Sequence, residues 1–340
     1  MENELVAQFR KVLPASEKLL IGPGDDAAVL RTSNADTVLT VDMLTDGVDF
    51  IVGETDPRLI GRKALAVNLS DLAAMAALPH SVLVAVVLPQ DGGEQLAVDL
   101  LDGMLPLANE FDIAIAGGDT NAWDGKLAVS ITAIGQVSPF GVIRRSGARP
   151  GDRILCTGSL GGSIFSRQFL FQPRIREALY LNEHYKIHAA MDISDGLLLD
   201  LSRMADESGL GFQIDESKIP VHPDVLKYKD LLNQSDPNPN RDPLPPVLRK
   251  SLRKKFKDQN PESREFQIDR ALSDGEDFEL ILAAAPEETK RLLNDQPFAD
   301  QGLILSEIGF FQEERNSFRK GLDGTIRPLA GTLGFVHRFK

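Results

Sequence analysis

Aspartates next to glycine or another small residue are the side chains of this sequence best suited to do chemistry. They recur in Gly24-Asp25-Asp26, Val41-Asp42, Ser70-Asp71, Gly118-Asp119, Asp192-Ile193-Ser194-Asp195 and Asp274-Gly275-Glu276-Asp277. Glycine permits tight turns and a close approach of the backbone. Taken singly, each motif is more often a turn or a helix cap. Taken together, carboxylates on several such turns are expected to point into one cleft.

A cluster of carboxylates requires cations. Two carboxylates about 4 Å apart repel by roughly 4 kcal/mol at an effective dielectric constant near 20, whereas a folded domain is stable by only about 5–15 kcal/mol. Oxygen ligands favour Mg²⁺ or Ca²⁺, and a chain with one cysteine and five histidines offers little to zinc or copper. Because Mg²⁺ held by a few carboxylates keeps positions for phosphate oxygens, the pattern indicates magnesium-dependent phosphate chemistry.

No second nucleotide-binding signature accompanies the aspartates. The lysine-bearing phosphate loop is missing, because Gly61-Arg62-Lys63 lacks its spacing and residues 158–163 lack its lysine. The kinase triplet Asp-Phe-Gly is missing too, since Asp277-Phe278 continues with Glu279. A phosphate-handling enzyme with this sequence must therefore rely on metal ions.

Length and charge exclude several classes of protein. The 340 residues suit two domains, and 37 Lys plus Arg against 50 Asp plus Glu give a net charge of −13. An acidic chain with 6% aromatic residues is a poor candidate for binding nucleic acid, which requires basic clusters and stacking platforms. The single cysteine, Cys156, excludes an intramolecular disulfide.

Hydropathy predicts no membrane contact. Residues 64–88 form the most apolar stretch, but Asn68 and Asp71 interrupt it and make it too polar to span a bilayer. The acidic N-terminus does not resemble a signal peptide. We therefore expect a cytoplasmic protein.

Strands and helices alternate along the chain, which predicts an α/β fold with α+β layers. In the first half we expect strands at 37–43, 82–88, 113–116 and 127–137, and helices at 57–77 and 94–110. The helix from 57 begins at a capping Asp56 followed by Pro57, and it carries Asn68 and Asp71 on one side. In the second half we expect strands at 153–157, 278–284 and 303–311, and a helix at 197–208.

Two changes in composition divide the chain further. The basic, Gly- and Pro-containing stretch 144–151 predicts a boundary between domains 1–146 and 147–340. Residues 229–269 are rich in Pro, Asn, Lys and Arg, which predicts a surface insertion or partly disordered loop. Its basic run is compatible with an acidic partner, although a solvated helix face is the favoured interpretation.

Taken in order, the motifs resemble those of the thiamine-monophosphate kinase family. The first half contributes Gly-Asp-Asp-Ala-Ala (24–28), Val-Asp-Met-Leu-x-x-Gly-Val-x-Phe (41–50), Gly-Arg-Lys-Ala-Leu-Ala-Val-Asn-Leu-Ser-Asp-Leu-Ala-Ala-Met (61–75) and Gly-Gly-Asp-Thr (117–120). The second half contributes Arg-Ser-Gly-Ala-Arg-Pro-Gly-Asp (145–152), Thr-Gly-Ser-Leu-Gly (157–161), Met-Asp-Ile-Ser-Asp-Gly-Leu (191–197) and Gly-Glu-Asp-Phe-Glu-Leu (275–280). The resemblance covers nearly the whole chain apart from the insertion.

This resemblance implies the two-domain fold of the aminoimidazole ribonucleotide synthetase superfamily. Its N-terminal domain forms a homodimer through a mixed sheet, and an α/β domain follows. The implied reaction passes the γ-phosphoryl group of ATP directly to thiamine monophosphate, with several Mg²⁺ ions. Because the acceptor phosphate is already anionic, no general base is required and no side chain is assigned a catalytic role of its own.

The resemblance also implies roles for individual residues. Seven positions match the family's metal site: Asp26, Thr40, Asp42, Asp71, Asp119, Asp192 and Asp195. Contacts to ATP match Gly118, Asp119, Arg145 and Ser194. Contacts to the substrate match Asp49, Glu276 and Phe335.

Four departures from the family pattern lie nearer the acceptor than the ATP. Asp49 stands where the family usually has His, and Asp274 replaces a Gly. The C-terminal aromatic motif at 334–339 is one residue longer, and the stretch 161–173 is shorter. Two alternatives therefore stay open, namely an ATP-dependent superfamily enzyme with another acceptor and a non-catalytic nucleotide-binding relative.

Overall fold

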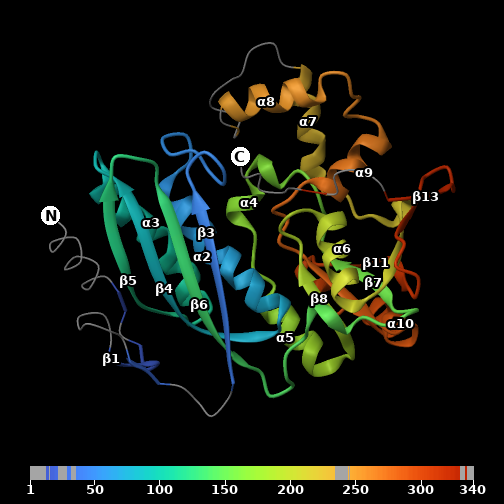
Figure 1. Cartoon of the computed structure of the whole chain (residues 1–340), viewed down its shortest axis with the longest axis horizontal. Helices are drawn as coiled ribbons and strands as arrows, with labels where there is room; N and C mark the ends of the chain where they lie inside the picture. The colour runs from blue at the N-terminus through green and yellow to red at the C-terminus, as the bar shows by residue number, and fades with distance from the viewer. Residues whose placement is uncertain are drawn as a thin grey trace. The chain divides into compact units, whose positions relative to one another are not determined.

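The computed structural model describes residues 13–14, 16–21, 29–31, 36–233, 244, 246–329 and 334. The chain divides into two compact units, Met1–Gly141 and Val142–Lys340. The division falls just ahead of the basic stretch that suggested a domain boundary. Each unit contains its own sheet and helices (Figure 1). No helix among these residues is long and apolar enough to cross a membrane.

The first unit is built on a four-stranded mixed sheet. Its strands in spatial order are β3 (Thr37–Thr45), β6 (Ala128–Val137), β4 (Ala77–Pro89) and β5 (Ala114–Trp123). β4 and β5 run parallel, whereas the other two pairs are antiparallel. The expected mixed sheet is therefore present. A separate two-stranded sheet pairs β1 (Leu19–Ile21) with β2 (Val29–Leu30).

Two helices, α2 (Pro57–Ala74) and α3 (Gly93–Glu110), pack closely together. A Cβ on Gly61 would lie 1.9 Å from the carbonyl oxygen of Leu100, and one on Gly103 would lie 1.8 Å from that of Arg58. Only glycine permits this approach, because any side chain would collide with rigid backbone. The Asp56 carboxylate caps α2 by accepting from the amide of Arg58, as its sequence predicts.

The Gly-Gly-Asp motif lies in a strand and not on a turn. β5 was expected to end near residue 116, but it continues to Trp123 beside β4. The strand can continue because Gly118 has no Cβ, which would lie 1.8 Å from the carbonyl oxygen of Val84. The expected helix at 57–77 is also shorter, since α2 ends at Ala74 and β4 begins at Ala77.

β3 has one polar face and one apolar face. Thr40 and Asp42 belong to the face that contacts α2. The opposite face carries Leu39, Val41 and Met43, whose exposed fractions are 65%, 61% and 64%. Three adjacent apolar side chains exposed on one strand form an unusual surface for a soluble monomer.

The second unit is built on a seven-stranded sheet. Its strands in spatial order are β13 (Ile326–Pro328), β12 (Phe318–Lys320), β9 (Gly211–Asp215), β11 (Leu305–Gln312), β7 (Arg153–Thr157), β10 (Leu280–Ala284) and β8 (Ile187–Asp192). The pairs are antiparallel except for β12 and β9. The helices are α4 (Arg167–Leu170), α5 (Ile175–His184), α6 (Leu197–Ser208), α7 (Lys227–Asn233), α8 (Pro246–Phe256), α9 (Arg264–Ser273) and α10 (Pro286–Asp295). β7 and α6 have the predicted bounds.

The described part of the 229–269 segment is mainly helical, with turns at 257–263, whereas its composition suggested a surface insertion or partly disordered loop. Its helices enclose an aromatic cluster of Phe165, Tyr228, Phe256 and Phe266, with ring centroids 4.8–5.6 Å apart. Residues 234–243 and 245 lie outside the described part. Burial of these rings stabilises a segment that is strongly polar by composition.

Replacing Gly103 by alanine tests the contact between α2 and α3. We expect Gly103→Ala to lower the free energy of unfolding by at least about 3 kcal/mol, because the new methyl group overlaps backbone that cannot yield. Urea titration followed by circular dichroism measures the effect. Glu94→Ala, at an exposed position of the same helix, is the control and should stay within about 0.5 kcal/mol of wild type. Equal stability of the two variants would contradict the close packing.

Candidate functional site

Three of the predicted metal ligands lie together in the first unit. The Thr40 hydroxyl donates to a carboxylate oxygen of Asp71. The backbone amide of Asp42 donates to Oδ1 of Asn68 over 3.1 Å. Asn68 is fully buried, and its own amide nitrogen donates to the carbonyl oxygen of Ala64 one turn earlier in α2. The i, i+3 spacing on α2 thus brings both Asn68 and Asp71 to the polar face of β3.

Asp119 lies elsewhere on the same sheet. Asp42 pairs with Ile131, Ile131 with Val84, and Val84 with Gly118. Since neighbouring strands lie about 4.8 Å apart, this row places Gly118 about 14 Å from Asp42. Asp119 follows in the next row and is exposed. Within this sheet, Asp42 and Asp119 are too far apart to share one ion.

The described residues contain no group of three or more His, Cys, Asp or Glu placed to hold a metal ion. The single cleft of converging carboxylates that the motif count suggested is therefore not seen in the described part of either unit. The acidic motifs form separate groups, one at β3 and α2 and others in the second unit. Asp26 and Phe335 lie outside the described residues.

Asp49 closes a turn with its carboxylate. Oδ2 accepts from the backbone amide of Thr45 over 2.7 Å and from its hydroxyl over 3.4 Å. The ammonium group of Lys63 donates to the carbonyl oxygen of Asp49 over 3.0 Å, and Lys63 is fully buried. Lys63 is therefore a packed structural residue of α2 and not a solvated one.

In the second unit, three of the predicted residues lie at the end of β8 and in the loop after it. Asp192 ends the strand and is buried, and Ser194 and Asp195 form the loop before α6. The backbone amides of Ser194 and Asp195 both donate to Oδ2 of Asp200, over 3.0 and 2.8 Å. Asp200 thus fixes this loop from the first turn of α6.

Asp200 was missed by sequence reasoning, although an acidic residue in the first turn of a helix is a known signal. It is fully buried, and this burial raises the pKa of its carboxyl to about 6. Arg203 opposes the shift by donating to Asp200 over 2.7 Å and to Asp195 over 2.6 Å. A metal ion at Asp195 would therefore compete with the Arg203 guanidinium.

A second loop, residues 274–278, is joined to the Ser194 loop by backbone hydrogen bonds. The amide of Glu276 donates to the carbonyl oxygen of Ser194 over 2.7 Å, and the amide of Phe278 donates to the carbonyl oxygen of Ile193 over 2.8 Å. The predicted ATP contact Ser194 and the predicted substrate contact Glu276 are therefore neighbours. Sequence spacing gave no sign of this contact.

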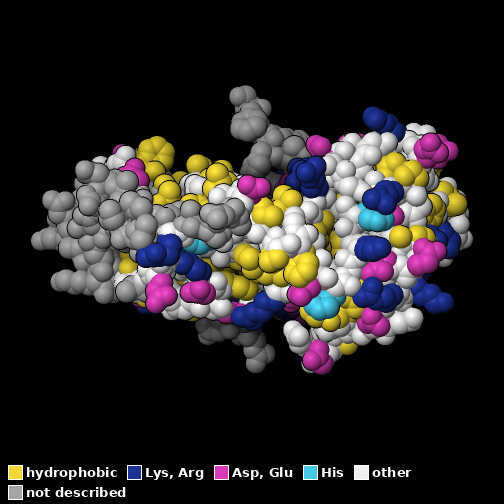
Figure 2. Space-filling view, turned by 90° about the horizontal axis from the view of Figure 1, so that it is seen from below, with side chains coloured by type: hydrophobic (Ala, Val, Ile, Leu, Met, Phe, Trp, Pro, Cys, Tyr) yellow, Lys and Arg dark blue, Asp and Glu magenta, His cyan; other side chains and the backbone are white. Residues whose placement is uncertain are grey.

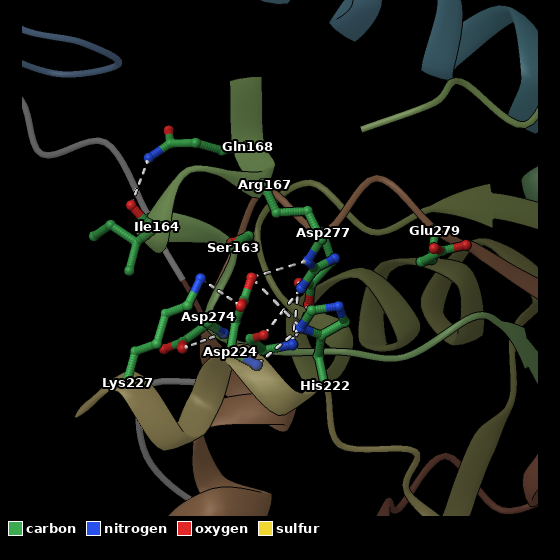
Figure 3. Close-up of polar contacts among 12 residues, drawn as sticks. Ser163, Ile164, Arg167, Gln168, His222, Asp224, Lys227, Asp274, Asp277 and Glu279 are labelled. Atoms are coloured by element: carbon green, nitrogen blue, oxygen red, sulfur yellow. Dashed lines mark hydrogen bonds and ion pairs between the residues drawn. The ribbon is translucent and has the colours of Figure 1, made fainter. Parts of the chain in front are cut away.

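The backbone amides of the glycine-rich loop, residues 158–163, donate hydrogen bonds to carboxylates of the protein itself. The amide of Gly161 donates to both oxygens of Asp277 at 3.0 Å, and that of Gly162 donates to Asp274 at 3.1 Å (Figure 3). Burial raises the pKa of Asp277 to about 7, although Arg167 donates to it. Because the amides of Gly161 and Gly162 already donate to carboxylates of the protein, these two amides do not form a binding site for a phosphate group.

Arg145 lies in the short 3₁₀ turn η1 (Arg145–Gly147), and it is exposed. The hydroxyl of Ser208 donates to its carbonyl oxygen over 3.2 Å. Downstream, Asp152 accepts from the amide of Arg149 and pairs with His188 at 2.8 Å. The backbone of the motif is thus fixed, whereas the Arg145 side chain faces solvent.

Family comparisons agree with this architecture. The model of the AIR synthase related protein N-terminal domain matches residues 24–137, and that of the C-terminal domain matches 149–309. Thiamine-monophosphate kinase of Rhodopirellula baltica is 35% identical over 317 residues, which are 91% of this chain and 89% of the relative. The chain belongs to the thiamine-monophosphate kinase family.

Solved structures of this family share the fold. Thiamine-monophosphate kinase from Stenotrophomonas maltophilia is 31% identical, with a TM-score of 0.71 and coverage of 95% of both chains. The structure of AaThiL complexed with AMPPCP and TMP is 25% identical, with a TM-score of 0.65 and coverage of 95% of this chain and 93% of that one. The expected α/β fold in two domains is confirmed.

The raised pKa of Asp200 predicts a pH-dependent stability. The Asp200 carboxyl has a pKa of about 6 in the folded protein and 3.8 when unfolded, so the folded state binds the proton more tightly. The protonated carboxyl therefore favours folding at low pH, and this contribution to stability is lost as the pH rises from about 4 to about 6. Asp200→Asn has no proton to lose. We therefore expect wild type to lose up to roughly 3 kcal/mol relative to Asp200→Asn over this range, measured by urea unfolding at several pH values. The raised pKa would be contradicted if the difference in unfolding free energy between wild type and Asp200→Asn did not change with pH, or if it changed in favour of wild type as the pH rises.

Proposed function

We propose that this chain transfers the γ-phosphoryl group of ATP to the phosphate of thiamine monophosphate, giving thiamine diphosphate and ADP. The observation that carries the proposal is the 35% identity to a thiamine-monophosphate kinase over nine-tenths of the chain. A family neighbour with the same fold is a complex with AMPPCP and TMP. These compounds are the two substrate types that the proposed reaction needs.

The donor atoms at β3 and α2 fit magnesium. Thr40 offers a hydroxyl, and Asp42 and Asp71 offer carboxylates, so the side-chain donors are oxygen atoms of the kind that Mg²⁺ prefers. Asp26, Asp119, Asp192 and Asp195 complete the proposed set. Bound Mg²⁺ neutralises the phosphate oxygens, which otherwise repel one another and the acidic site.

The protein's own residues bind and orient the two substrates. Gly118, Asp119, Arg145 and Ser194 are the proposed ATP contacts. The exposed guanidinium of Arg145 suits phosphate oxygens because it is planar and permanently charged. Since the acceptor phosphate is already an anion, positioning and charge neutralisation carry the transfer without a general base.

Glu276, Asp49 and Phe335 are the proposed acceptor contacts. The backbone bond between Glu276 and Ser194 supports a place for Glu276 beside the ATP contacts of the second unit. At Asp49, one carboxylate oxygen already accepts from Thr45. That turn keeps an acidic side chain in a fixed place where the family usually has a histidine.

The apolar face of β3 supports a homodimer. Leu39, Val41 and Met43 are exposed side by side, and a second copy of the same strand is self-complementary across a two-fold axis.

On the face seen in Figure 2, cationic and anionic side chains are interspersed, and no broad basic patch is present among the residues coloured there. Because the chain has a net charge of −13 and nucleic-acid binding requires basic clusters, we propose small anionic substrates as partners and no nucleic acid.

The activity is tested with purified protein, MgATP and a panel of phosphorylated acceptors. We expect thiamine diphosphate and ADP from thiamine monophosphate, and turnover lost at least about a thousandfold in Asp42→Asn and in Asp119→Asn. Circular dichroism should show an intact fold in both variants, and Glu94→Ala should keep wild-type activity. ADP formation with another acceptor only would reassign the substrate, and full activity of either Asn variant would refute its metal role.

The dimer is tested by placing a charge on the apolar face. Met43→Glu puts carboxylates from two copies into one contact, so we expect dissociation to a monomer by light scattering during size exclusion. Ser251→Glu, at an exposed position of α8, is the charge-matched control. A dimer unaffected by Met43→Glu would place the interface elsewhere.

A further inference from the structure

The 274–278 loop is strained and must be held by its surroundings. Glu276 and Phe278 have φ values of 64° and 50°, in the left-handed region that non-glycine residues avoid. Each such residue is disfavoured and persists only where neighbouring contacts determine its conformation. Because Glu276 is the proposed acceptor contact, the groups that hold this loop also decide where Glu276 stands.

Arg167 holds one side of the loop. Its Nη2 donates to Oδ1 of Asp277 over 2.7 Å and to the carbonyl oxygen of Gly161 over 2.9 Å. Asp277 is completely buried, and only 17% of the Arg167 side chain is exposed. The hydroxyl of Ser163 adds a bond of 2.5 Å to the carbonyl oxygen of Gly275. Figure 3 shows these groups converging from α4, the glycine-rich loop and the 274–278 loop.

Tyr228 holds the other side of the loop. Its hydroxyl donates to Oδ2 of Asp274 over 3.1 Å, and Arg270 donates to Oδ1 of the same carboxylate over 3.2 Å. The Tyr228 ring is buried among Phe165, Phe256 and Phe266. Helices α7 and α9, at the two ends of the 229–269 insertion, therefore reach the loop through Tyr228 and Arg270. These contacts connect the ends of the insertion to the proposed site.

The Ser194 loop has its own anchor. Its amides are fixed by Asp200, which is paired with Arg203. Loss of the contacts at Arg167 or Tyr228 therefore leaves the principal anchor of Ser194 in place. The two loops share backbone hydrogen bonds, but separate side chains position them.

We infer that Arg167 and Tyr228 are positioning residues for the acceptor: through Asp277 and Asp274 they hold Glu276 in the conformation that meets the acceptor. The inference rests on the proposed function. It assigns a task to Arg167, which lies in the stretch that is shorter than the family norm, and to Tyr228, which directly precedes the 229–269 insertion. Neither residue touches a reacting atom.

Steady-state kinetics separate positioning from stability. In Arg167→Met and Asp277→Asn we expect the KM for thiamine monophosphate to rise at least about tenfold, with the KM for MgATP within about twofold of wild type. Tyr228→Phe keeps the ring contacts and removes one hydrogen bond, so a rise of about threefold to tenfold is expected. Arg167→Lys retains the charge and should restore part of the acceptor affinity. Arg291→Met, which breaks a pair with Glu288 on α10, is the control.

The double variant Arg167→Met/Asp277→Asn distinguishes a loss of positioning from a loss of stability. Arg167→Met or Asp277→Asn alone leaves a buried polar group without its partner, which lowers stability. The double variant removes both charges, so its melting temperature should recover toward wild type while the KM for the acceptor stays high. Recovery of the acceptor KM together with stability would overturn the positioning role, and so would wild-type acceptor KM values in Arg167→Met.

Hydrogen exchange tests the loop independently of any substrate. In Arg167→Met without ligands, we expect faster exchange in peptides covering 274–279 and unchanged exchange at the amides of Ser194 and Asp195, which donate to Asp200. Unchanged exchange at 274–279 would overturn the inference. If wild type forms no thiamine diphosphate, the proposed function fails, and this measurement still decides whether Arg167 holds the loop.

Discussion

The neutralisation of carboxylates in a strongly acidic chain is the constraint on which this structure depends. A net charge of −13 makes every closely placed pair of acids a source of repulsion. In the second unit, arginine side chains neutralise these carboxylates. Arg203 pairs with Asp195 and Asp200, and Arg167 pairs with Asp277. Loops that would otherwise repel one another are held together by these pairs.

Buried ion pairs of this kind define geometry more than they add stability. Removing two charges from water costs several kcal/mol for each ion, and a good hydrogen-bonding arrangement only compensates for that cost. Asp277 illustrates the balance, since both its oxygens accept from Gly161 and one also accepts from Arg167. The benefit is a loop that keeps two non-glycine residues in left-handed conformations. Strain of this sort is typical of sites that must hold a substrate in place.

In the first unit, backbone packing determines which acids come together. α2 and α3 contact at Gly61 and Gly103, and that close contact helps to fix α2 on the sheet. Asp71 then meets Thr40, and Asn68 meets the backbone of Asp42. The same sheet keeps Asp119 three strands away from Asp42. The chain thus separates its acidic motifs into distinct groups.

Sequence alone determined the elements with the strongest local signals. The Asp56-Pro57 start of α2, the bounds of β7 and α6, and the i, i+3 relation of Asn68 and Asp71 follow from capping, alternation and helical periodicity, which act over a few residues. The order of the motifs was also enough to indicate the family.

Only the tertiary structure decided which motifs meet. Asp42 and Asp119 look alike in the sequence, but strand pairing puts Gly118, the residue before Asp119, about 14 Å from Asp42. Ser194 and Glu276 are more than eighty positions apart and share a backbone hydrogen bond. The tasks of Asp200 and Arg167 also depend on long-range contacts, because a charged side chain gives no local sign of which buried carboxylate or amide it will meet. Burial and pairing are properties of the packed chain, and local sequence patterns do not contain them.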